Sequence, residues 1–345
     1  MWNINSSNSQ YIYRFTDEFI CDVLSWACTN KGIKSIPIVR KTNLNAKLKS
    51  LVEYRYFWKL REHMYKLTTC KKINEVRIAY LYFSNHYIKI IKGDIVNYPI
   101  LDNNTINHIT PIFRYFYDNL LDNEYFWNVY NPSHKYMTKL ELRGIDTAHK
   151  TCPYCDRNHI VPSSANNIDH LLPQSDFPFL SIYWRNLVIS CSNCNSKNVK
   201  GNDWYLPILH PCYDKVEDIL YFSFDKSKQQ IIISVRNNTP SEISNQKKGD
   251  NFIKALKLNK SYEKMWFLLK NERRAMFECI SEAIDNSSGK TNVIIPIEKG
   301  IERREAEHIQ EKQTETYTKL KLDYCLYAKT QTHEVLAEWL NEEYK

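Results

Sequence analysis

Residues 152–155 read Cys-Pro-Tyr-Cys, residues 168–175 read Ile-Asp-His-Leu-Leu-Pro-Gln-Ser, and residues 186–197 read Asn-Leu-Val-Ile-Ser-Cys-Ser-Asn-Cys-Asn-Ser-Lys. The two Cys-x-x-Cys pairs are separated by 35 residues, and their four thiolates, Cys152, Cys155, Cys191 and Cys194, can close a tetrahedral Zn²⁺ site. Four sulfur ligands leave no open position, so this zinc would be structural. Disulfides are the alternative. We find no secretory signal and no long apolar run, so we expect a reducing cytoplasm and no membrane association, which favours metal.

The segment between the two cysteine pairs is expected to form two short strands followed by a helix. A strand pattern around Ile168 ends at Pro173, residues 186–189 suit a second strand, and the polar sequence from Ser192 suits a helix. Adjacent residues of a strand point to opposite faces. The side chains of Asp169 and His170 can therefore act on the same bound group only if the strand bends locally or a metal lies near the strand edge.

Residues 152–202 resemble HNH endonucleases of the ββα-metal class, in the subgroup with two zinc-binding cysteine pairs. The matching positions are Asp169-His170, Pro173-Gln174-Ser175, Asn186-Leu187, Cys191-x-x-Cys194-Asn195 and Lys197. Residues 168–175 also resemble the corresponding stretch in the HNH domain of RNA-guided CRISPR nucleases, including the nine-residue step from Asn186 to Asn195. Several fixed positions match at once, which a short motif rarely does by chance.

This resemblance implies that His170 is the general base, that Asn186 orients it, and that Asp169 and Asn195 bind one catalytic divalent cation. A neutral imidazole can take a proton from water near neutral pH when a neighbour fixes its tautomer. Mg²⁺ prefers oxygen ligands, and Mn²⁺ can substitute for it. The founding pattern has histidine where this chain has Asp169 and Asn195. Both changes replace nitrogen with oxygen ligands, which favours Mg²⁺ or Mn²⁺ over Zn²⁺ at the catalytic ion.

Each of these residues also has an ordinary structural interpretation. An isolated Asp-His pair usually lies in a surface turn, and Asn186 could cap a strand, but their joint placement outweighs both interpretations. Lys197 and Lys200 are expected either to bind nucleic-acid phosphates or simply to be solvated. His159 is expected to be structural or solvent-exposed, because four thiolates already complete the zinc shell.

The formal net charge of +8 is unevenly distributed. Residues 31–92 contain fifteen Lys or Arg and three acidic residues, interleaved with aromatic residues. The charge excess suits binding to a nucleic-acid backbone, whereas the aromatic residues are more simply explained as core. The chain has seven glycines and neither G-x-G-x-x-G nor G-x-x-x-x-G-K-[ST], which argues against a Rossmann or P-loop nucleotide site.

The overall pattern predicts an α+β, mostly helical protein with a central ββα-metal HNH nuclease domain, stabilised by the four-cysteine zinc site and flanked by helical segments. We expect a basic helical region over 1–134, the HNH domain with its zinc-binding pairs over 135–213, and a C-terminal β-hairpin plus helical region over 214–345. Helices are expected over 8–30, 44–68, 74–92, 103–130 and 135–149. Residues 219–224 and 230–235 alternate like a β-hairpin.

The HNH-like segment is followed by Leu209–Tyr213, and this arrangement resembles the HNH subunits of bacterial antiphage systems of the Septu type. In those systems the nuclease works with a separate ABC-like ATPase. The resemblance implies a cytoplasmic nuclease effector that cuts DNA, or RNA, with a partner ATPase of the ABC or SMC-like type. The alternative is a non-cleaving zinc-stabilised module that binds nucleic acid or a partner. A base accompanied by two oxygen ligands favours cleavage.

Overall fold

The computed structural model describes residues 2, 11–137, 150–160, 166–236, 240–286, 294–312 and 314–343. The chain forms two compact units. The N-terminal unit comprises Ile4–Thr147 and Ile160–Tyr213, and the C-terminal unit comprises Met1–Asn3, Ala148–His159 and Asp214–Lys345. Most of the expected HNH region therefore lies in one unit with the expected N-terminal region, and the expected C-terminal region begins where the second unit resumes.

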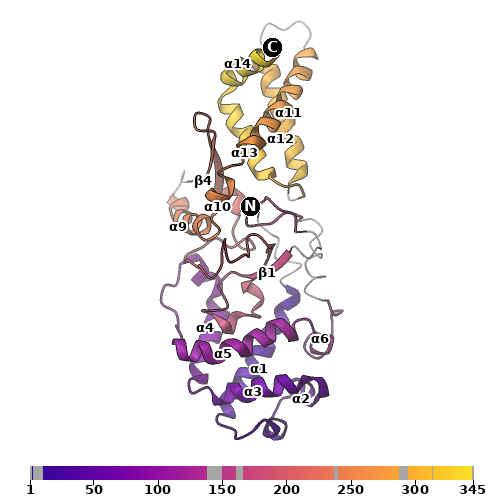
Figure 1. The fold of residues 1–345 in the computed structure, drawn as a ribbon, viewed down its shortest axis with the longest axis vertical. Coiled ribbons are helices and arrows are strands. Elements are labelled where there is room, and N and C mark those ends of the chain that lie inside the picture. Colours follow the sequence, from indigo (N-terminus) through magenta and orange to yellow (C-terminus); the bar gives the residue numbers. More distant parts are fainter. Residues whose placement is uncertain are drawn as a thin grey trace. The chain divides into compact units, whose positions relative to one another are not determined.

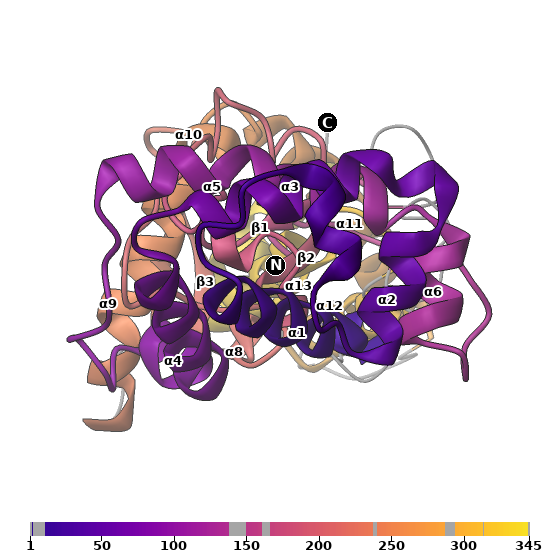
Figure 2. The same cartoon turned by 90° about the horizontal axis from the view of Figure 1, so that it is seen from below.

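The N-terminal unit consists mainly of helices. They are α1 (Phe15–Thr29), α2 (Ala46–Glu53), α3 (Trp58–Thr69), α4 (Ile73–Lys92), α5 (Asn103–Tyr115) and α6 (Glu124–Tyr130), with the shorter helical turns η1 (Tyr11–Arg14), η2 (Ile36–Lys41), η3 (Arg55–Phe57) and the π-helical η4 (Phe116–Leu120). Helix α1 packs against α3 and α4, and α3 packs against α5 (Figures 1 and 2).

The buried faces of these helices follow the 3.6-residue period expected for amphipathic helices. In α1, for example, Phe19 is fully buried, and its ring makes edge contacts with Phe116, Phe126 and Tyr130 at centroid distances of 5.1, 4.9 and 5.4 Å. The helices expected over 8–30 and 74–92 are confirmed where the structure describes those residues. The helical stretch expected over 103–130 is interrupted at residues 121–123, between η4 and α6. Of the helix expected over 135–149, residues 135–137 are not helical and the rest lie outside the described residues.

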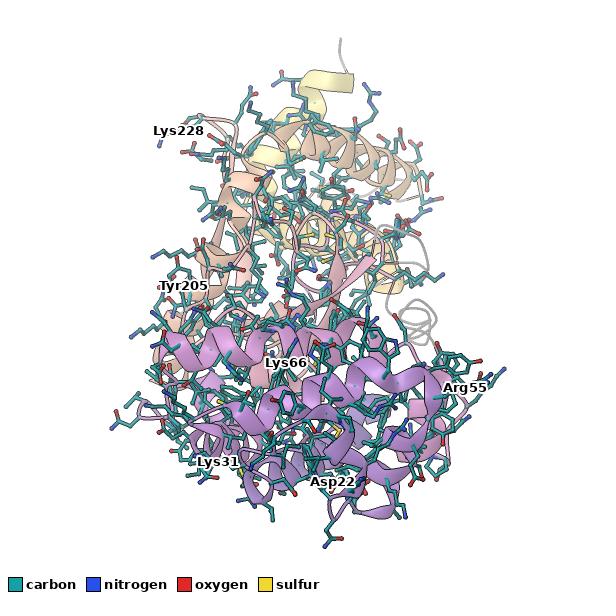
Figure 3. The ribbon with its side chains drawn as sticks, turned by 60° about the horizontal axis from the view of Figure 1, so that its bottom comes forward. Asp22, Lys31, Arg55, Lys66, Tyr205 and Lys228 are labelled. Atoms are coloured by element: carbon teal, nitrogen blue, oxygen red, sulfur yellow. The ribbon has the colours of Figure 1, made fainter. Side chains whose placement is uncertain are left out.

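The single helix predicted over 44–68 is wrong, because the chain breaks between α2 and α3. Tyr54 is extended (φ −63°, ψ 121°) and stacks on Tyr125 at 3.9 Å, so tertiary contact overrides local helix propensity. The η3 turn then leaves Tyr56 and Trp58 exposed at 61% and 55%. The side chain of Arg55, labelled in Figure 3, lies over the ring of Tyr56.

The strands of the N-terminal unit are β1 (Asn166–His170) and β2 (Leu187–Cys191), which pair antiparallel. The η5 (Pro178–Leu180) and η6 (Trp184–Asn186) turns lie between them in sequence. Helices α4 and α5 both pack on η5. The helical layer therefore supports the loop that joins the two strands.

The C-terminal unit combines a hairpin with a helical bundle. Its elements are α8 (Val216–Ile219), β3 (Leu220–Asp225), β4 (Gln230–Val235), α9 (Pro240–Ala255), α10 (Leu258–Tyr262), α11 (Trp266–Asp285), α12 (Ile294–Glu311), α13 (Thr318–Thr330) and α14 (Thr332–Glu343). Strands β3 and β4 pair antiparallel, which confirms the predicted hairpin. Helices dominate both units, in agreement with the expected mostly helical α+β class. None of the described helices is both long and apolar enough to cross a membrane.

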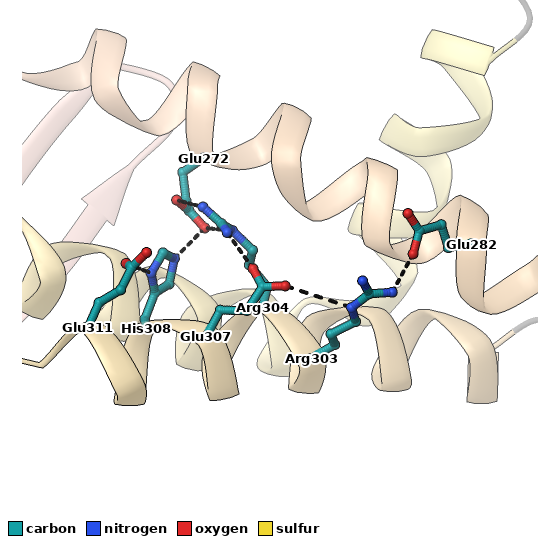
Figure 4. Close-up of polar contacts among 7 residues, drawn as sticks. All are labelled: Glu272, Glu282, Arg303, Arg304, Glu307, His308 and Glu311. Atoms are coloured by element: carbon teal, nitrogen blue, oxygen red, sulfur yellow. Dashed lines mark hydrogen bonds and ion pairs between the residues drawn. The ribbon is translucent and has the colours of Figure 1, made fainter.

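A buried charged network joins α11 to α12 (Figure 4). Arg304 donates to both oxygens of Glu272 at 2.8 and 3.1 Å, and His308 Nε2 lies 2.7 Å from the same carboxylate. Burial opposes ionisation of Glu272, but the bonds from His308 and Arg304 outweigh it and lower the pKa of this carboxyl. Gly300 lies at the same helix pair, where an added Cβ would fall 2.7 Å from the Cα of Ile280.

Candidate active site

The two strands between the cysteine pairs carry the predicted catalytic residues. In their register, Asp169 lies opposite Val188 and His170 opposite Leu187, and the Leu171 amide donates to the Asn186 carbonyl at 2.9 Å just beyond the paired residues. The backbone of His170 is therefore fixed on both sides by strand pairing. Hydrogen-bonded strand ends are stiff positions from which a side chain can be aimed.

His170 is held as a neutral imidazole in a single tautomer. Its Nε2 lies 2.8 Å from the Ser181 carbonyl oxygen, and its ring lies 4.6 Å from the Tyr117 ring. A carbonyl can only accept, so Nε2 must carry the hydrogen and Nδ1 must hold the lone pair. Desolvation lowers the pKa of His170 to about 4. The hydrogen bonds of the described residues include none to Nδ1, and His170 is half-buried, so Nδ1 is the nitrogen that could accept a proton.

Among the described residues, the hydrogen bonds of the Asn186 side chain go to the loop between the strands and to helix α4, so its expected role in orienting His170 would act through that loop. The Asn186 side chain is fully buried, its Oδ1 accepts from the Leu172 amide at 2.8 Å, and its Nδ2 donates to the Leu172 carbonyl at 3.0 Å and to the Leu180 carbonyl at 3.3 Å. Asn186 thus clamps both ends of the loop that leads to Ser181.

Tyr87 completes this clamp from helix α4. Its hydroxyl donates to Asn186 Oδ1 at 2.9 Å, and the whole side chain is buried. Sequence reasoning missed Tyr87 because it lies 99 residues upstream of Asn186. It also missed Ser181, whose contribution is a backbone carbonyl that any residue type would supply.

Asp169 forms a buried ion pair with Lys200. The Nζ of Lys200 lies 2.8 Å from Oδ1 and 2.7 Å from Oδ2, and it also donates to the His170 carbonyl. The two side chains are 4% and 3% exposed. The expectation that Lys200 would simply be solvated is therefore wrong, because its ammonium is buried against the Asp169 carboxylate. Phosphate binding by Lys200 stays a prediction.

The segment after β2 forms successive turns over residues 192–202 instead of the predicted helix. Ser192, Asn193 and Asn195 are residues whose side chains compete with helical backbone bonding, and Gly201 adopts a left-handed φ of +55°. Asn195 is half-buried in these turns, and its backbone N–H donates to the Cys191 carbonyl at 3.2 Å. Lys197 is exposed.

The four cysteines predicted to bind zinc are all buried, and their sulfur atoms lie within 4.8 Å of one another. Four sulfurs at bonds of about 2.3 Å around one zinc ion would stand about 3.8 Å apart, so this cluster suits a tetrahedral metal site. Two polar groups also point at the sulfurs, the Cys194 amide at 3.5 Å from Cys191 Sγ and Asn158 Nδ2 at 3.9 Å from Cys155 Sγ. N–H groups placed in this way can donate to metal-bound sulfur.

The first cysteine pair is anchored within the C-terminal unit. Asp156 adopts a left-handed φ of +55°, and its carboxylate accepts from the Trp2 indole at 2.7 Å and from the Lys319 amide at 2.8 Å. Tyr154 is buried against Phe252. His159 is exposed and pairs through its backbone with Thr151, as expected for a residue outside the metal shell.

The Leu209–Tyr213 segment supports the turn that precedes β2. His210 is fully buried, its Nε2 donates to the Arg185 carbonyl at 2.9 Å, and its Nδ1 accepts from the Cys212 amide at 3.1 Å. Both ring nitrogens are therefore committed, so His210 positions Arg185 and cannot exchange protons with a substrate.

Comparison with known proteins agrees with this geometry. Residues 152–201 match the family model described as HNH endonuclease. Over 75 residues, the chain is 31% identical to the Septu protein PtuB of Bacillus thuringiensis, and this stretch covers 22% of the chain. The chain spans 29% of the length of that relative. No solved structure matches. The resemblance predicted from the sequence is confirmed, and residues 152–201 constitute an HNH endonuclease domain in a chain that is similar to a Septu protein.

Proposed function

We propose that this protein is a metal-dependent endonuclease that hydrolyses DNA phosphodiester bonds with His170 as the general base. One observation carries the proposal: His170 Nε2 lies 2.8 Å from the Ser181 carbonyl oxygen, which leaves Nδ1 as the nitrogen with the lone pair. Burial, which lowers the pKa of His170 to about 4, supports a neutral ring. In the reaction, Nδ1 removes a proton from water, the water oxygen bonds to phosphorus, and the bond from phosphorus to the leaving 3′ oxygen breaks.

Asp169 and Asn195 are the residues that would hold the divalent ion, Mg²⁺ or Mn²⁺. Carboxylate and amide oxygens suit these ions, and the buried Asp169 carboxylate already requires a positive neighbour. The bound ion would stabilise negative charge on the phosphate oxygens and on the leaving oxygen. Cys152, Cys155, Cys191 and Cys194 would hold a structural Zn²⁺.

The similarity to Septu protein PtuB supports a role as the nuclease component of a bacterial antiphage defence system. A partner ATPase of the ABC or SMC-like type and a cytoplasmic location belong to this proposal. The exposed Lys197 and the basic helical surface that includes Arg55 and Lys59 would contact the DNA backbone.

The decisive experiment compares plasmid cleavage by the full-length protein, alone and with its partner ATPase, with and without Mg²⁺ or Mn²⁺. His170→Ala should abolish nicking and linearisation, because the variant lacks the imidazole that removes a proton from water. Its zinc content, measured by mass spectrometry, should stay the same. His159→Ala removes an exposed histidine that follows Cys155 in the sequence, and it is the matched control. Cleavage by His170→Ala at the rate of the unmodified protein would refute the assignment.

A second function, a zinc-stabilised binding module without cleavage, is favoured by the Asp169–Lys200 ion pair, because that pair engages both oxygens of the proposed ion ligand. Under this alternative the unmodified protein would bind DNA but would not bind Mn²⁺ outside the cysteine site. Manganese binding to the zinc-loaded protein therefore separates the two functions.

A further inference from the structure

We infer that Lys200 competes with the catalytic ion for Asp169. The ammonium group of Lys200 binds the Asp169 carboxylate and must leave it before a divalent cation can bind. The inference rests on the proposed function, because it concerns the ion that Asp169 would hold.

The contacts of Lys200 saturate its ammonium group. An ammonium has three N–H donors, and this one reaches Oδ1 and Oδ2 of Asp169 at 2.8 and 2.7 Å together with the His170 carbonyl. The nearly equal distances centre Nζ on the carboxylate. A cation that binds both carboxylate oxygens would need that same position.

Burial makes this arrangement exclusive. Both side chains are almost inaccessible to solvent, at 4% for Asp169 and 3% for Lys200, so water cannot screen a second positive charge beside the ammonium. A carboxylate carries one negative charge and cannot neutralise a lysine and a divalent ion together. Binding of the ion therefore requires displacement of Lys200, whose flexible four-carbon stem allows such a movement.

The position of Lys200 in the chain couples this displacement to the second ion ligand. Lys200 and Asn195 both lie in the turn segment 192–202 that follows β2. The Gly201 amide bonds to the Ser196 carbonyl at 3.0 Å, which ties the two parts of the segment together. Movement of Lys200 therefore occurs in the segment that carries Asn195. The free energy needed to move Lys200 weakens the observed binding of the ion by the same amount.

The test measures ion binding in the absence of DNA. Full-length zinc-loaded protein is titrated with Mn²⁺ and followed by electron paramagnetic resonance of the free ion. Lys200→Met should bind Mn²⁺ at least about tenfold more tightly than the unmodified protein, because the competing charge is gone. Lys197→Met, which removes an exposed lysine from the same turn segment, should not change the affinity for Mn²⁺. Equal or weaker binding by Lys200→Met would overturn the inference.

Thermal unfolding supplies a second readout that does not depend on cleavage. Removal of Lys200 takes away the ammonium that pairs with the buried Asp169 carboxylate, so Lys200→Met should unfold at a lower temperature in chelator, and Mn²⁺ should raise that temperature by more than in the unmodified protein. Lys200→Arg keeps the charge and should respond to Mn²⁺ as the unmodified protein does. A Lys200→Met protein whose unfolding temperature ignores Mn²⁺ would contradict the inference.

The two proposals fail in different ways. If the unmodified protein, with and without its partner, neither cleaves DNA nor binds Mn²⁺ outside the cysteine site, the proposed function is wrong. If it does both and Lys200→Met binds the ion no more tightly, the nuclease assignment stands and only the competition by Lys200 is wrong.

Discussion

Replacing Asn186 by alanine should strongly destabilise the N-terminal unit. The side chain makes four hydrogen bonds in a fully buried position, with the Tyr87 hydroxyl, the Leu172 amide, the Leu172 carbonyl and the Leu180 carbonyl. A buried neutral group left without a partner costs about 1–3 kcal/mol, and the loop can relax to recover part of that cost. We expect a loss of about 4 kcal/mol in the free energy of unfolding of this unit.

Tyr87→Phe provides the matched control, because it removes one of the four bonds and keeps the ring. Its cost should be about 1 kcal/mol. Urea unfolding followed by tryptophan fluorescence measures both variants. Hydrogen exchange of peptides from residues 168–181 gives the local result, since the Leu172 amide loses its acceptor in Asn186→Ala and should exchange much faster. A loss below about 1 kcal/mol, or slow exchange at Leu172, would refute the clamp.

The same variant tests how His170 is oriented. Asn186 holds the loop that carries Ser181, and the Ser181 carbonyl fixes the imidazole. The Asn186→Ala variant should therefore lose DNA-cleavage activity, although the hydrogen bonds of the Asn186 side chain go to the loop and not to the imidazole ring. Tyr87→Phe should retain most of the activity, because all three bonds from Asn186 to the loop remain.

Three further predictions concern the metal, the base and the surface. Cys194→Ser should lose zinc and unfold at a lower temperature, because structural zinc contributes folding free energy; a variant with normal stability and no zinc would contradict this. Because burial lowers the pKa of His170 from 6.5 to about 4, the imidazole stays neutral in the folded protein at pH 5.5, so cleavage should persist there. Between pH 6.5 and 4 the unfolded chain binds a proton that the folded protein does not, so this residue's contribution to stability falls as the pH is lowered; an activity loss centred near 6.5 would count against the assignment. Lys59→Ala should weaken DNA binding and reduce its salt dependence by about one ion, as measured by fluorescence anisotropy; an unchanged salt slope would exclude contact.

Local patterns sufficed for much of the fold. The β1–β2 pair, the β3–β4 hairpin and the helices α1, α4 and α5 follow the expected periods, because each buries one continuous apolar face. The break at Tyr54 left no local sign, since it depends on a ring stack with Tyr125 in helix α6. The turns over 192–202 differ from the predicted helix, because a polar sequence suits successive turns as well as it suits a helix.

In the candidate site, too, some residues could be predicted from local sequence and others could not. Residue types, spacing and the family resemblance predicted Asp169, His170 and the four cysteines as site residues, since such side chains can bind a metal or accept a proton. The partners that fix them come from elsewhere, as with the Ser181 backbone and the Lys200 ammonium. A sequence records which side chains exist, but it does not record which carbonyl or counter-ion the fold will bring beside each of them.

The close approach of α11 and α12 at Gly300 offers a way to separate the tasks of the two units. An added Cβ would collide with backbone atoms of Ile280, and a rigid backbone cannot yield as a side-chain tip can. Gly300→Val would therefore force this helix pair apart while leaving every residue of the HNH domain chemically intact. Cells that carry such a variant would reveal whether the proposed antiphage activity requires only the HNH domain or also the helical bundle that follows it.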